Sequence, residues 1–595
     1  MQTNNNVNLL HTLNFPNDLK QLDLTQLNQL ASELHTEMLN LAKLKNIHFS
    51  SNLGVIELTI ALIKCFNPKD DQIVFDIGHQ AYIYKMLTGR LNAMPTIKQY
   101  QGISSYQNPV ESVYDKWTAG HAGTSLSAIT GMYLGMTPQE RLNNYVVGII
   151  GDGSIVSTMA LEALESNSAL KAPVIIIIND NNMSITPSFG GIHQLLVSLE
   201  TKPQGSKNFF TDLGYSYIGV VNGHDINALI IALNQAKEIQ HNQHKSVIVH
   251  IKTIKGNGFI QDTDGSYHTW KYGTDSNESI PLTTGYFLGN KLMERFQTKK
   301  DFMVVSPSMT YRFGFNPIKN KLPDYFIDLG IQEENAVTMA AGIASMHQFR
   351  PIVATYSTFL LRTYDQLWHD VARQNLGITL LLDSCDISAG NGTSHNGVFD
   401  VSMLKSIPNS IITDGMTNEQ TWKLLKMSLD LNPNQIFSVR MDHMQDEAST
   451  SIINEVNELP VEFGNWQILA DNQENDVCFI SYGTHFLHLY EKIKPIKNLS
   501  IVNALFISQY DKKNLDWLIA RHFHTIIVYE RINEENTLGT GIETYFFEQG
   551  IKDVKIIKMN YHGFLFQAKN QELDELVHMD DNHIISTIKE FTDEE

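Results

Sequence analysis

The feature of this sequence that most limits its fold is a series of short apolar, β-branched runs separated by longer stretches of mixed polarity. The runs are Val146–Ile150, Val174–Ile178, Val247–Ile251, Ile352–Tyr356, Ile378–Leu382, Val477–Ser481 and Thr525–Tyr529. Continuous apolar runs of this length are typical of strands buried on both faces of a parallel sheet. The intervening stretches are long enough for helices, so the alternation predicts an α/β fold with mainly parallel sheets flanked by helices.

The length of the chain requires several domains, because 595 residues exceed what one hydrophobic core supports. A stretch rich in Gly, Asp, Ser and Thr, Asn257–Pro281, is expected to end a first α/β domain. The acidic, apolar-poor segment Asp446–Pro460 separates two further blocks. We therefore predict three domains, at residues 1–285, 286–455 and 456–595.

The charge and the cysteine content limit the partners and the compartment. Lys and Arg total 44 against 64 Asp and Glu, a net charge of −20, which argues against nucleic acid as a main partner. The three cysteines, Cys65, Cys385 and Cys478, are widely separated and form no disulfide framework, which suits a reducing compartment. The polar N-terminus and the lack of a long apolar run predict a cytoplasmic protein without a membrane partner.

The strongest local motif consists of two loops that follow neighbouring predicted strands. Gly151-Asp152-Gly153-Ser154 follows the first, and Asn179-Asp180-Asn181-Asn182-Met183 follows the second, about one strand–helix–strand unit later. Ligands of parallel sheets bind beyond the carboxyl ends of the strands, so both loops are expected at one edge. An isolated Gly-Asp-Gly would be an ordinary turn, but the strand context and the second loop favour a binding site.

The side chains of this motif suit a hard divalent cation and a diphosphate. A carboxylate and an amide oxygen are ligands that magnesium prefers, and backbone, phosphate or water oxygens complete its shell. The predicted metal ligands are Asp152, Asn181 and Met183. Gly153 leaves the backbone open to a diphosphate beside Ser154, and the following helix N-terminus favours negative charge.

This pairing resembles the magnesium-diphosphate motif of thiamine-diphosphate enzymes. Around it, the chain from about residue 40 to 445 resembles the 1-deoxy-D-xylulose-5-phosphate synthase family, within the transketolase-like group. The matching segments include His48–Gly54, Phe75–Tyr82, Gly120–Ser125, Lys255–Phe259, Glu333–Thr338, Tyr356–Arg362 and Gly392–Gly397. The resemblance implies a diphosphate-binding, a pyrimidine-binding and a C-terminal domain, a homodimer, and the cofactors thiamine diphosphate and Mg²⁺.

The resemblance also implies a reaction. Pyruvate is decarboxylated on the cofactor, and the two-carbon unit is added to an aldehyde, which in the family is glyceraldehyde 3-phosphate. Two alternatives remain open: a transketolase-type ketol transfer between sugars without decarboxylation, and a catalytically silent paralogue with a binding role. Retention of Asp152, Asn181 and Glu333 argues against the silent paralogue.

Residue roles are carried over from the family position by position. Glu333 is expected to hydrogen-bond the aminopyrimidine and, being buried there, to have a raised pKa; the alternative is a surface residue beside Glu334. The expected cofactor contacts are His79, Gly120, His121, Ala122, Gly153, Ser154, Asn181, Phe259 and Phe359. The residues expected to face substrate are His48, His268, His395 and Tyr356, where imidazoles relay protons to carbonyl oxygens. Plain core packing is the alternative for Tyr356 and Phe359, and an exposed ion pair is the alternative for Arg362.

Departures from the family pattern concentrate at the acceptor side. Ser384 and His443 stand where the family has phosphate-binding arginines, and Asn391 stands where it has an aspartate. Charge-assisted hydrogen bonds contribute about 1.5–3 kcal/mol each, so losing two guanidiniums weakens phosphate binding considerably. We therefore predict substrate contacts at Arg362, Asn391, Ser384 and His443, and an acceptor that is unphosphorylated or differently placed.

Overall fold

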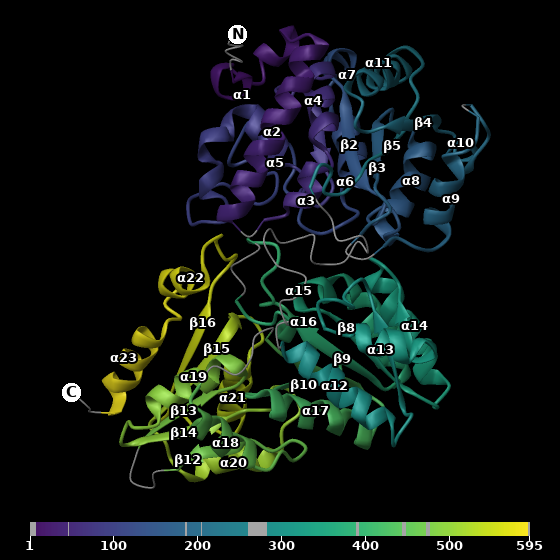
Figure 1. Cartoon of the computed structure of the whole chain (residues 1–595). Helices are drawn as coiled ribbons and strands as arrows, with labels where there is room; N and C mark the ends of the chain where they lie inside the picture. Colours follow the sequence, from purple (N-terminus) through teal and green to yellow (C-terminus); the bar gives the residue numbers. More distant parts are fainter. Residues whose placement is uncertain are drawn as a thin grey trace. The chain divides into compact units, whose positions relative to one another are not determined.

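The computed structural model describes residues 8–45, 47–184, 187–203, 205–259, 283–387, 392–442, 448–471 and 476–592. These residues form two compact units, Met1–Ser279 and Ile280–Glu595, the first with one sheet and the second with two (Figure 1). All three sheets are mainly parallel and flanked by helices, which confirms the predicted α/β architecture. The domain boundaries drawn from the sequence stay a prediction.

The sheet of the first unit is parallel throughout and has the order β1-β2-β3-β5-β4. Its strands are β1 (Gln72–Phe75), β2 (Val146–Gly151), β3 (Ile175–Asp180), β4 (Ser216–Asn222) and β5 (Val247–Lys252). Alternate residues of each strand enter different cores, because successive side chains point to opposite faces. Both faces of the sheet are covered, so the sheet forms a rigid base for the loops at the carboxyl ends of its strands.

Helices cover both faces of this sheet. One face packs on α2 (Leu24–Leu44), α4 (Ile56–Cys65) and α11 (Ile226–Asn242). The other packs on α6 (Ser125–Gly135), α8 (Thr158–Leu170), α9 (Gly191–Leu199) and α10 (Phe209–Asp212). The shorter helices of this unit are α1 (Leu9–Thr12), α3 (Phe49–Leu53), α5 (Tyr82–Lys85) and α7 (Pro138–Asn143), with single turns at Asp18–Gln21, Met86–Arg90 and Leu91–Thr96.

The first sheet of the second unit has the order β10-β11-β9-β8-β6-β7, again parallel. Its strands are β6 (Phe302–Ser306), β7 (Phe326–Asp328), β8 (Arg350–Tyr356), β9 (Ile378–Asp383), β10 (Ile411–Asp414) and β11 (Ile436–Arg440). One face packs on α12 (Thr284–Phe296), α13 (Asn316–Lys321) and α17 (Asn418–Leu431). The other packs on α14 (Glu333–Ser345) and α16 (Asp400–Lys405). Short turns are α15 (Ser357–Leu360), Pro323–Tyr325, Leu361–Thr363, Gln366–Val371 and Ala372–Gln374.

The second sheet of this unit has the order β12-β14-β13-β15-β16 and ends in an antiparallel edge strand, β12. Its strands are β12 (Gln467–Ala470), β13 (Val477–Ser481), β14 (Leu499–Asn503), β15 (Thr525–Asn533) and β16 (Lys555–Tyr561). Its helices are α18 (Thr450–Glu458), α19 (Thr484–Ile493), α20 (Lys512–Ala520), α21 (Leu538–Glu548), α22 (Asn570–Leu576) and α23 (Asp581–Thr592). Buried residues of both sheets belong to one continuous core, so this unit is held together by apolar packing.

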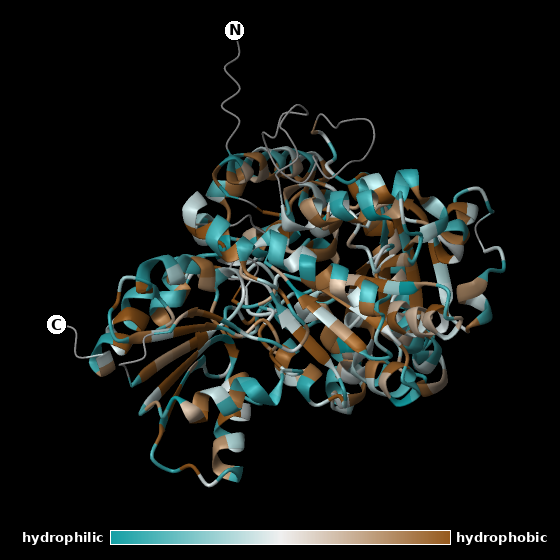
Figure 2. Cartoon of the chain, turned by 90° about the horizontal axis from the view of Figure 1, so that it is seen from below, coloured by the Kyte–Doolittle hydropathy of each residue, from teal (hydrophilic) through white to brown (hydrophobic). Residues whose placement is uncertain are grey.

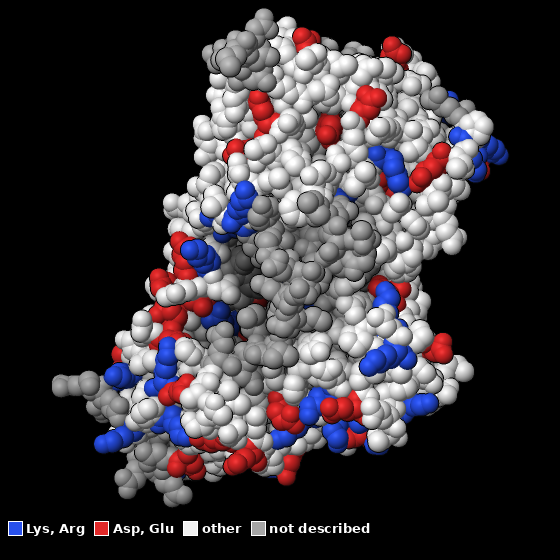
Figure 3. Space-filling model, in the orientation of Figure 1, with Lys and Arg blue, Asp and Glu red and all other residues white. Residues whose placement is uncertain are grey.

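The distribution of side chains follows from these layers. Figure 2 shows hydrophobic residues concentrated on the strands and polar residues on the outer faces of many helices. On the face drawn in Figure 3, acidic and basic side chains are interspersed. No helix in the described ranges is long and apolar enough to span a bilayer.

Candidate active site

The carboxyl edge of the first unit's sheet brings the two predicted motif loops together. β2 and β3 are neighbours, and Asp152 and Asn181 directly follow their last residues. The backbone N–H of Asp152 donates to the carbonyl of Asn179 at 3.2 Å, and that of Asn181 donates to the Asp152 carboxylate at 3.4 Å. The Ser188 hydroxyl donates to the other carboxylate oxygen at 2.6 Å. Asp152 is therefore fixed in a position shared by both loops.

The electrostatics of this edge suit a cation. Burial raises the pKa of Asp152 to about 7, an effect that the hydrogen bond from Ser188 only partly offsets. A buried carboxylate of this kind is stabilised by a positive charge placed against it. Within the described residues, no three His, Cys, Asp or Glu side chains are grouped to hold a metal ion. A cation at Asp152 would therefore need amide, backbone or phosphate oxygens, as the sequence motif predicts.

A buried lysine lies at the same edge. The Lys255 ammonium donates to the backbone carbonyl of Ser184 at 2.8 Å, and the charge of Asp152 acts on it. Burial lowers the pKa of Lys255 to about 7, and the Asp152 carboxylate opposes that shift. Lys255 begins one of the segments that carry the family resemblance, but no sequence pattern placed its side chain near Asp152.

Gly153 allows the two loops to approach each other. A Cβ built on Gly153 would lie 2.4 Å from the Ser184 Cβ and 3.0 Å from its Cα. Real Cβ atoms do not come this close, so any side chain here pushes the second loop away. Glycine is needed for the contact between the loops, which is a different reason from the open backbone that the sequence suggested.

We expect Gly153→Ala to separate the motif loops and to lower the free energy of unfolding by about 1–3 kcal/mol, the usual cost of overpacking. Gly151→Ala is the matched control, because a Cβ on Gly151 meets no atom of the described residues within 4 Å. Denaturant unfolding of both variants without added cofactor measures the difference. Equal stability of the two variants would contradict the proposed reason for Gly153.

The loop carrying Gly120, His121 and Ala122 is fixed by Asp76, which follows β1. The Asp76 carboxylate accepts hydrogen bonds from the Gly123 N–H at 3.0 Å and from the Ser125 hydroxyl at 2.7 Å. The Ser154 hydroxyl also hydrogen-bonds Asp76. Asp76 thereby ties the expected cofactor loop to the motif loop after β2.

Two of the predicted histidines lie side by side. The ring centroids of His48 and His79 are 5.8 Å apart, and Asn52 donates from its amide to the backbone carbonyls of both at 2.8 Å. Burial lowers the pKa of His79 to about 4, so its ring is neutral near pH 7. Its Nδ1 is buried and has no hydrogen-bond partner among the described residues. Such a buried polar atom is suited to a ligand.

Phe259 lies at the last described position before residue 260. Its ring packs edge-on against Phe49 with centroids 5.3 Å apart, and it borders the core beneath α2 and α4. The ring is thus oriented by packing, whereas its contact with a cofactor stays a prediction.

In the second unit, Glu333 is the first residue of α14 and is 6% exposed. Burial raises its pKa to about 7, against the positive charge of Arg362 and together with the negative charge of Glu334. Its Oε2 is buried without a hydrogen-bond partner in the described parts of the chain. Glu333 is therefore not a surface residue, and its raised pKa means that its carboxyl group takes up a proton much closer to neutral pH than an exposed one does.

Three aromatic rings form a row at the carboxyl end of β8. Tyr356 and Phe359 are stacked with centroids 5.3 Å apart at 23°, and His395 meets Phe359 edge-on at 5.4 Å. The Ser394 hydroxyl lies 2.8 Å from the His395 Nδ1. Tyr356 and Phe359 also border the apolar core, so packing and a binding role are compatible at both positions.

Comparison with known proteins identifies the family. The family model of 1-deoxy-D-xylulose-5-phosphate synthase matches residues 10–208 and 204–253, and that of the transketolase pyrimidine-binding domain matches residues 281–444. The synthase of Malacoplasma penetrans is 32% identical, with 96% of this chain and 97% of the relative covered. The synthase of Aquifex aeolicus is 33% identical, with 97% of both covered. The chain belongs to the 1-deoxy-D-xylulose-5-phosphate synthase family.

Among solved structures, the transketolase of Campylobacter jejuni matches 96% of this chain and 100% of its own length, with 14% identity and a TM-score of 0.43. The synthase family to which the chain belongs uses thiamine diphosphate.

For a member of this synthase family, the surroundings of Ser384 are informative. Ser384 follows β9 and has a backbone φ of 55°, uncommon for a residue with a side chain. Arg312, from the loop after β6, donates from Nε to Asp383 at 2.9 Å and from Nη2 to the Ser384 hydroxyl at 3.2 Å. Its guanidinium carbon lies 5.2 Å from the Tyr356 ring centroid. The sequence did not single out Arg312, since 71 positions separate it from Asp383.

Some of the residues predicted from the synthase resemblance cannot be placed. His268, Asn391 and His443 lie outside the described residues. Arg362 is half-buried, and its charge acts on Glu333. Asn52 and Asp76 were missed as positioning residues, although both belong to segments that carry the resemblance.

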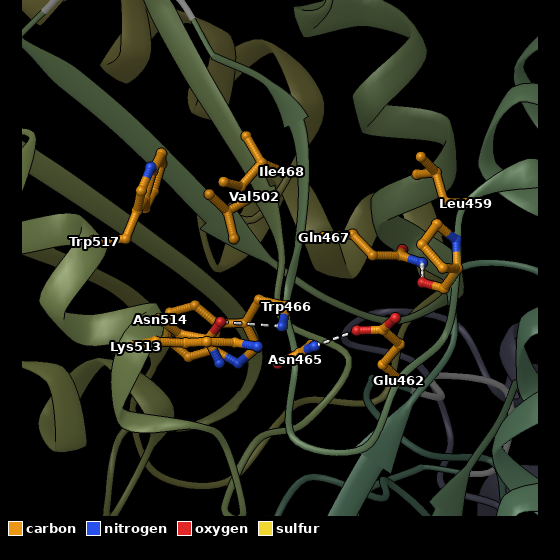
Figure 4. A pocket seen from close by; sticks show the side chains of 11 residues that line it. Leu459, Glu462, Asn465, Trp466, Gln467, Ile468, Val502, Lys513, Asn514 and Trp517 are labelled. Carbon is orange, nitrogen blue, oxygen red and sulfur yellow. Dashed lines mark hydrogen bonds between the residues drawn. The ribbon is translucent and has the colours of Figure 1, made fainter.

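A separate pocket of about 470 Å³ opens at the edge of the last sheet (Figure 4). Figure 4 shows Trp466 and Trp517 among its lining residues, together with Ile468 and Val502, which pair across β12 and β14. None of the predicted site residues that the structure describes lines this pocket, so it is distinct from the candidate active site.

Proposed function

We propose that this chain is a thiamine-diphosphate- and magnesium-dependent carboligase that decarboxylates pyruvate and adds the two-carbon unit to an aldehyde. The observation that carries the proposal is the buried carboxylate of Asp152, fixed beside Asn181 at the ends of adjacent strands in a synthase-family chain. Bound thiamine diphosphate supplies the reactive carbon on which pyruvate loses carbon dioxide.

The first unit's sheet edge would bind the metal and the diphosphate. Asp152 and the Asn181 amide oxygen would hold magnesium, with the Met183 carbonyl as a further ligand. The Asn181 amide oxygen now accepts from the Met183 N–H at 3.0 Å, which orients it at the loop tip. Gly153 and Ser154 would adjoin the diphosphate, and Lys255 contributes positive charge at the same edge.

The remaining groups would orient the cofactor and handle protons. Neutral His79 can donate or accept a hydrogen bond, and we assign it to the cofactor together with Gly120, His121, Ala122, Phe259 and Phe359. His48, His268 and His395 are assigned to the carbonyl oxygens of the substrates, where an imidazole moves a proton at modest cost. Glu333 would hydrogen-bond the aminopyrimidine nitrogen, for which its raised pKa suits it.

Organisation and location are part of the proposal. The strands of the three sheets fall within the predicted domains 1–285, 286–455 and 456–595, which supports those boundaries. A homodimer is proposed from the family resemblance, with pyruvate and an aldehyde as the small-molecule partners, and a cytoplasmic location is proposed from the polar N-terminus and the cysteine usage. The matched relatives are named as synthases, which does not favour ketol transfer or a silent paralogue.

The proposed reaction is tested by incubating the purified chain with thiamine diphosphate, Mg²⁺, pyruvate and a panel of aldehydes. We expect carbon dioxide release that depends on the aldehyde, together with a product two carbons longer than the acceptor. Ketol exchange between sugars without carbon dioxide release would instead establish the transketolase reaction. Cofactor binding without turnover of pyruvate would contradict the proposal.

Asp152→Asn should lose most of the affinity for magnesium, because the amide keeps the shape but removes the charge. We expect at least a roughly tenfold higher Mg²⁺ concentration for half-maximal stabilisation against heat in the presence of thiamine diphosphate, the scale of losses at metal sites. Asp70→Asn, on an exposed loop before β1, is the control and should match the wild type. Unchanged magnesium dependence in Asp152→Asn would rule out this metal site.

A further inference from the structure

The loop that carries Arg312 is fixed by its neighbours. Met309, Phe313 and Phe315 are buried in the core on one face of the second unit's first sheet. The Phe313 N–H donates to the carbonyl of Met309 at 3.1 Å, and the Phe315 N–H donates to that of Thr310 at 2.9 Å. Arg312 thus projects from a tight turn whose conformation does not depend on its own side chain.

The turn directs Arg312 across the sheet. The order of the strands is β9-β8-β6, so a side chain from the loop after β6 must pass the end of β8 to reach β9. Arg312 does so over the ring of Tyr356, the last residue of β8, and reaches Asp383 and Ser384. These positions lie in register, because Tyr356 pairs with Asp383.

The far end of this contact is also fixed. Asp383 is fully buried, and it accepts the N–H of Ser384 at 2.6 Å in addition to the Arg312 Nε at 2.9 Å. A Cβ on Gly397 would lie 2.1 Å from the Ser384 carbonyl oxygen, so Ser384 is closely packed against that backbone. The Arg312 side chain is nevertheless 26% exposed. A guanidinium is therefore presented at the position where Ser384 itself offers only a hydroxyl.

We propose that Arg312, together with the Ser384 hydroxyl, binds the phosphate of a short phosphorylated aldehyde acceptor. This inference rests on the proposed function and decides between the two acceptors that the sequence left open. The acceptor is phosphorylated, but the arginine that binds its phosphate comes from the loop after β6. A guanidinium suits this task because its N–H groups form a planar fork that matches phosphate oxygens.

The row of rings beside Arg312 supports the assignment to the acceptor. Tyr356 lies under the guanidinium, stacks on Phe359, and through it adjoins His395. His395 and Tyr356 are the residues assigned to substrate on other grounds. A phosphate bound at Arg312 and the reacting carbonyl of the same acceptor would thus contact side chains of one continuous row.

The test compares D-glyceraldehyde 3-phosphate with D-glyceraldehyde as acceptors, with pyruvate saturating. In Arg312→Met we expect the KM for the phosphorylated aldehyde to rise roughly tenfold to hundredfold, as the loss of a charge-assisted contact implies. The kcat/KM for D-glyceraldehyde should change less than about twofold, since this acceptor lacks the group that Arg312 binds. A parallel fall for both acceptors, or no change for either, would overturn the proposal.

Two further variants control for folding and charge. Arg312→Met leaves Asp383 without its guanidinium partner, so the double variant Arg312→Met with Asp383→Asn removes that charge and should show the same acceptor selectivity. Arg312→Lys keeps the charge without the fork and should fall between wild type and Arg312→Met. Arg373→Met, an exposed arginine elsewhere in this unit, should behave as wild type with both acceptors.

A binding measurement separates this inference from the proposed reaction. Isothermal titration calorimetry measures the binding of inorganic phosphate to the full-length wild type and to the double variant. We expect at least a roughly tenfold weaker affinity in the double variant, whether or not the protein turns over pyruvate. Equal phosphate affinity of the two proteins would overturn the role of Arg312. If the wild type instead binds phosphate but releases no carbon dioxide from pyruvate, only the proposed function is overturned.

Discussion

Replacing Glu333 with Gln should abolish most activity and yet stabilise the protein at alkaline pH. The amide cannot take up or give away a proton, so we expect carboligation to fall by roughly 10²-fold or more, the range typical of a lost acid–base group. The effect should fall on kcat, with thiamine diphosphate still bound. Steady-state turnover of pyruvate and the aldehyde at saturating cofactor measures it.

The stability change follows from the raised pKa of Glu333. Burial raises it from the ordinary 4.5 to about 7; the positive charge of Arg362 opposes this shift and the negative charge of Glu334 adds to it. Between pH 4.5 and pH 7 the folded chain keeps a proton on Glu333 that the unfolded chain has lost. The free energy of unfolding therefore falls as the pH rises through this range. The loss amounts to about 3 kcal/mol at 1.36 kcal/mol per pH unit. Above pH 7 the cofactor-free Glu333→Gln variant should be more stable than wild type by up to that amount.

Glu334→Gln is the matched control because it removes the same charge one residue further along. We expect it to lower activity by less than about tenfold and to leave the pH dependence of unfolding near that of wild type. Urea unfolding of the cofactor-free proteins at pH 5 and pH 8 compares all three. A Glu333→Gln variant that is inactive but no more stable than wild type at pH 8 would mean that the folded protein does not raise the pKa of Glu333.

Arg440→Met should be the most destabilising single change considered for the second unit. Arg440 is fully buried at the end of β11 and donates to three carboxylates: Asp400 at 2.9 Å, Asp414 at 2.6 Å and Asp386 at 2.9 Å. Methionine fills similar space but leaves these carboxylates buried without a cation. Breaking a buried ion pair in this way costs about 3–5 kcal/mol.

The cost should depend on pH in a defined direction. Without the guanidinium, the folded state favours protonated carboxyl groups, so it binds more protons than the unfolded chain, and its stability rises as pH falls. The deficit of Arg440→Met relative to wild type should therefore shrink from pH 8 to pH 5 in denaturant unfolding. Arg373→Met should differ from wild type by no more than about 0.5 kcal/mol, as is usual at the surface. A deficit that does not change with pH would indicate lost packing in place of unpaired charge.

This ion cluster also shows how the two sheets of the second unit are coupled. Asp386, which Arg440 binds on one side, accepts from the His485 Nδ1 at 2.9 Å on the other. His485 belongs to α19 beside the last sheet, whereas Asp386 follows β9. The contact between Asp386 and His485 therefore links the two sheets with a directed hydrogen bond, in addition to the apolar packing between them.

The features that depend on local sequence patterns, namely the strands of the apolar runs and the loops at their ends, were predicted from the sequence. Each apolar run named from the sequence is a strand in the structure, because β-branched runs between helical stretches have few other stable arrangements. The loops of Asp152 and Asn181 were placed together correctly, since a strand–helix–strand unit brings consecutive strand ends to one edge. The other strands were not named from the sequence: β1, β4, β6, β7, β10, β11, β12, β14 and β16. Among them β12 is antiparallel and has only four residues.

Contacts that cross the sheet order were decided only by tertiary structure. Arg312 meets Ser384 because β8 lies between β6 and β9, an order that no local pattern encodes. Arg440 likewise gathers three aspartates from separate segments, and Asn52 fixes two histidines through their backbones. Strands and their end loops arise from neighbours along the chain, whereas charge pairing and burial arise from neighbours in space. For that reason the sequence alone determined the type of fold and the two motif loops, and only the tertiary structure decided that the Arg312 guanidinium lies against Ser384.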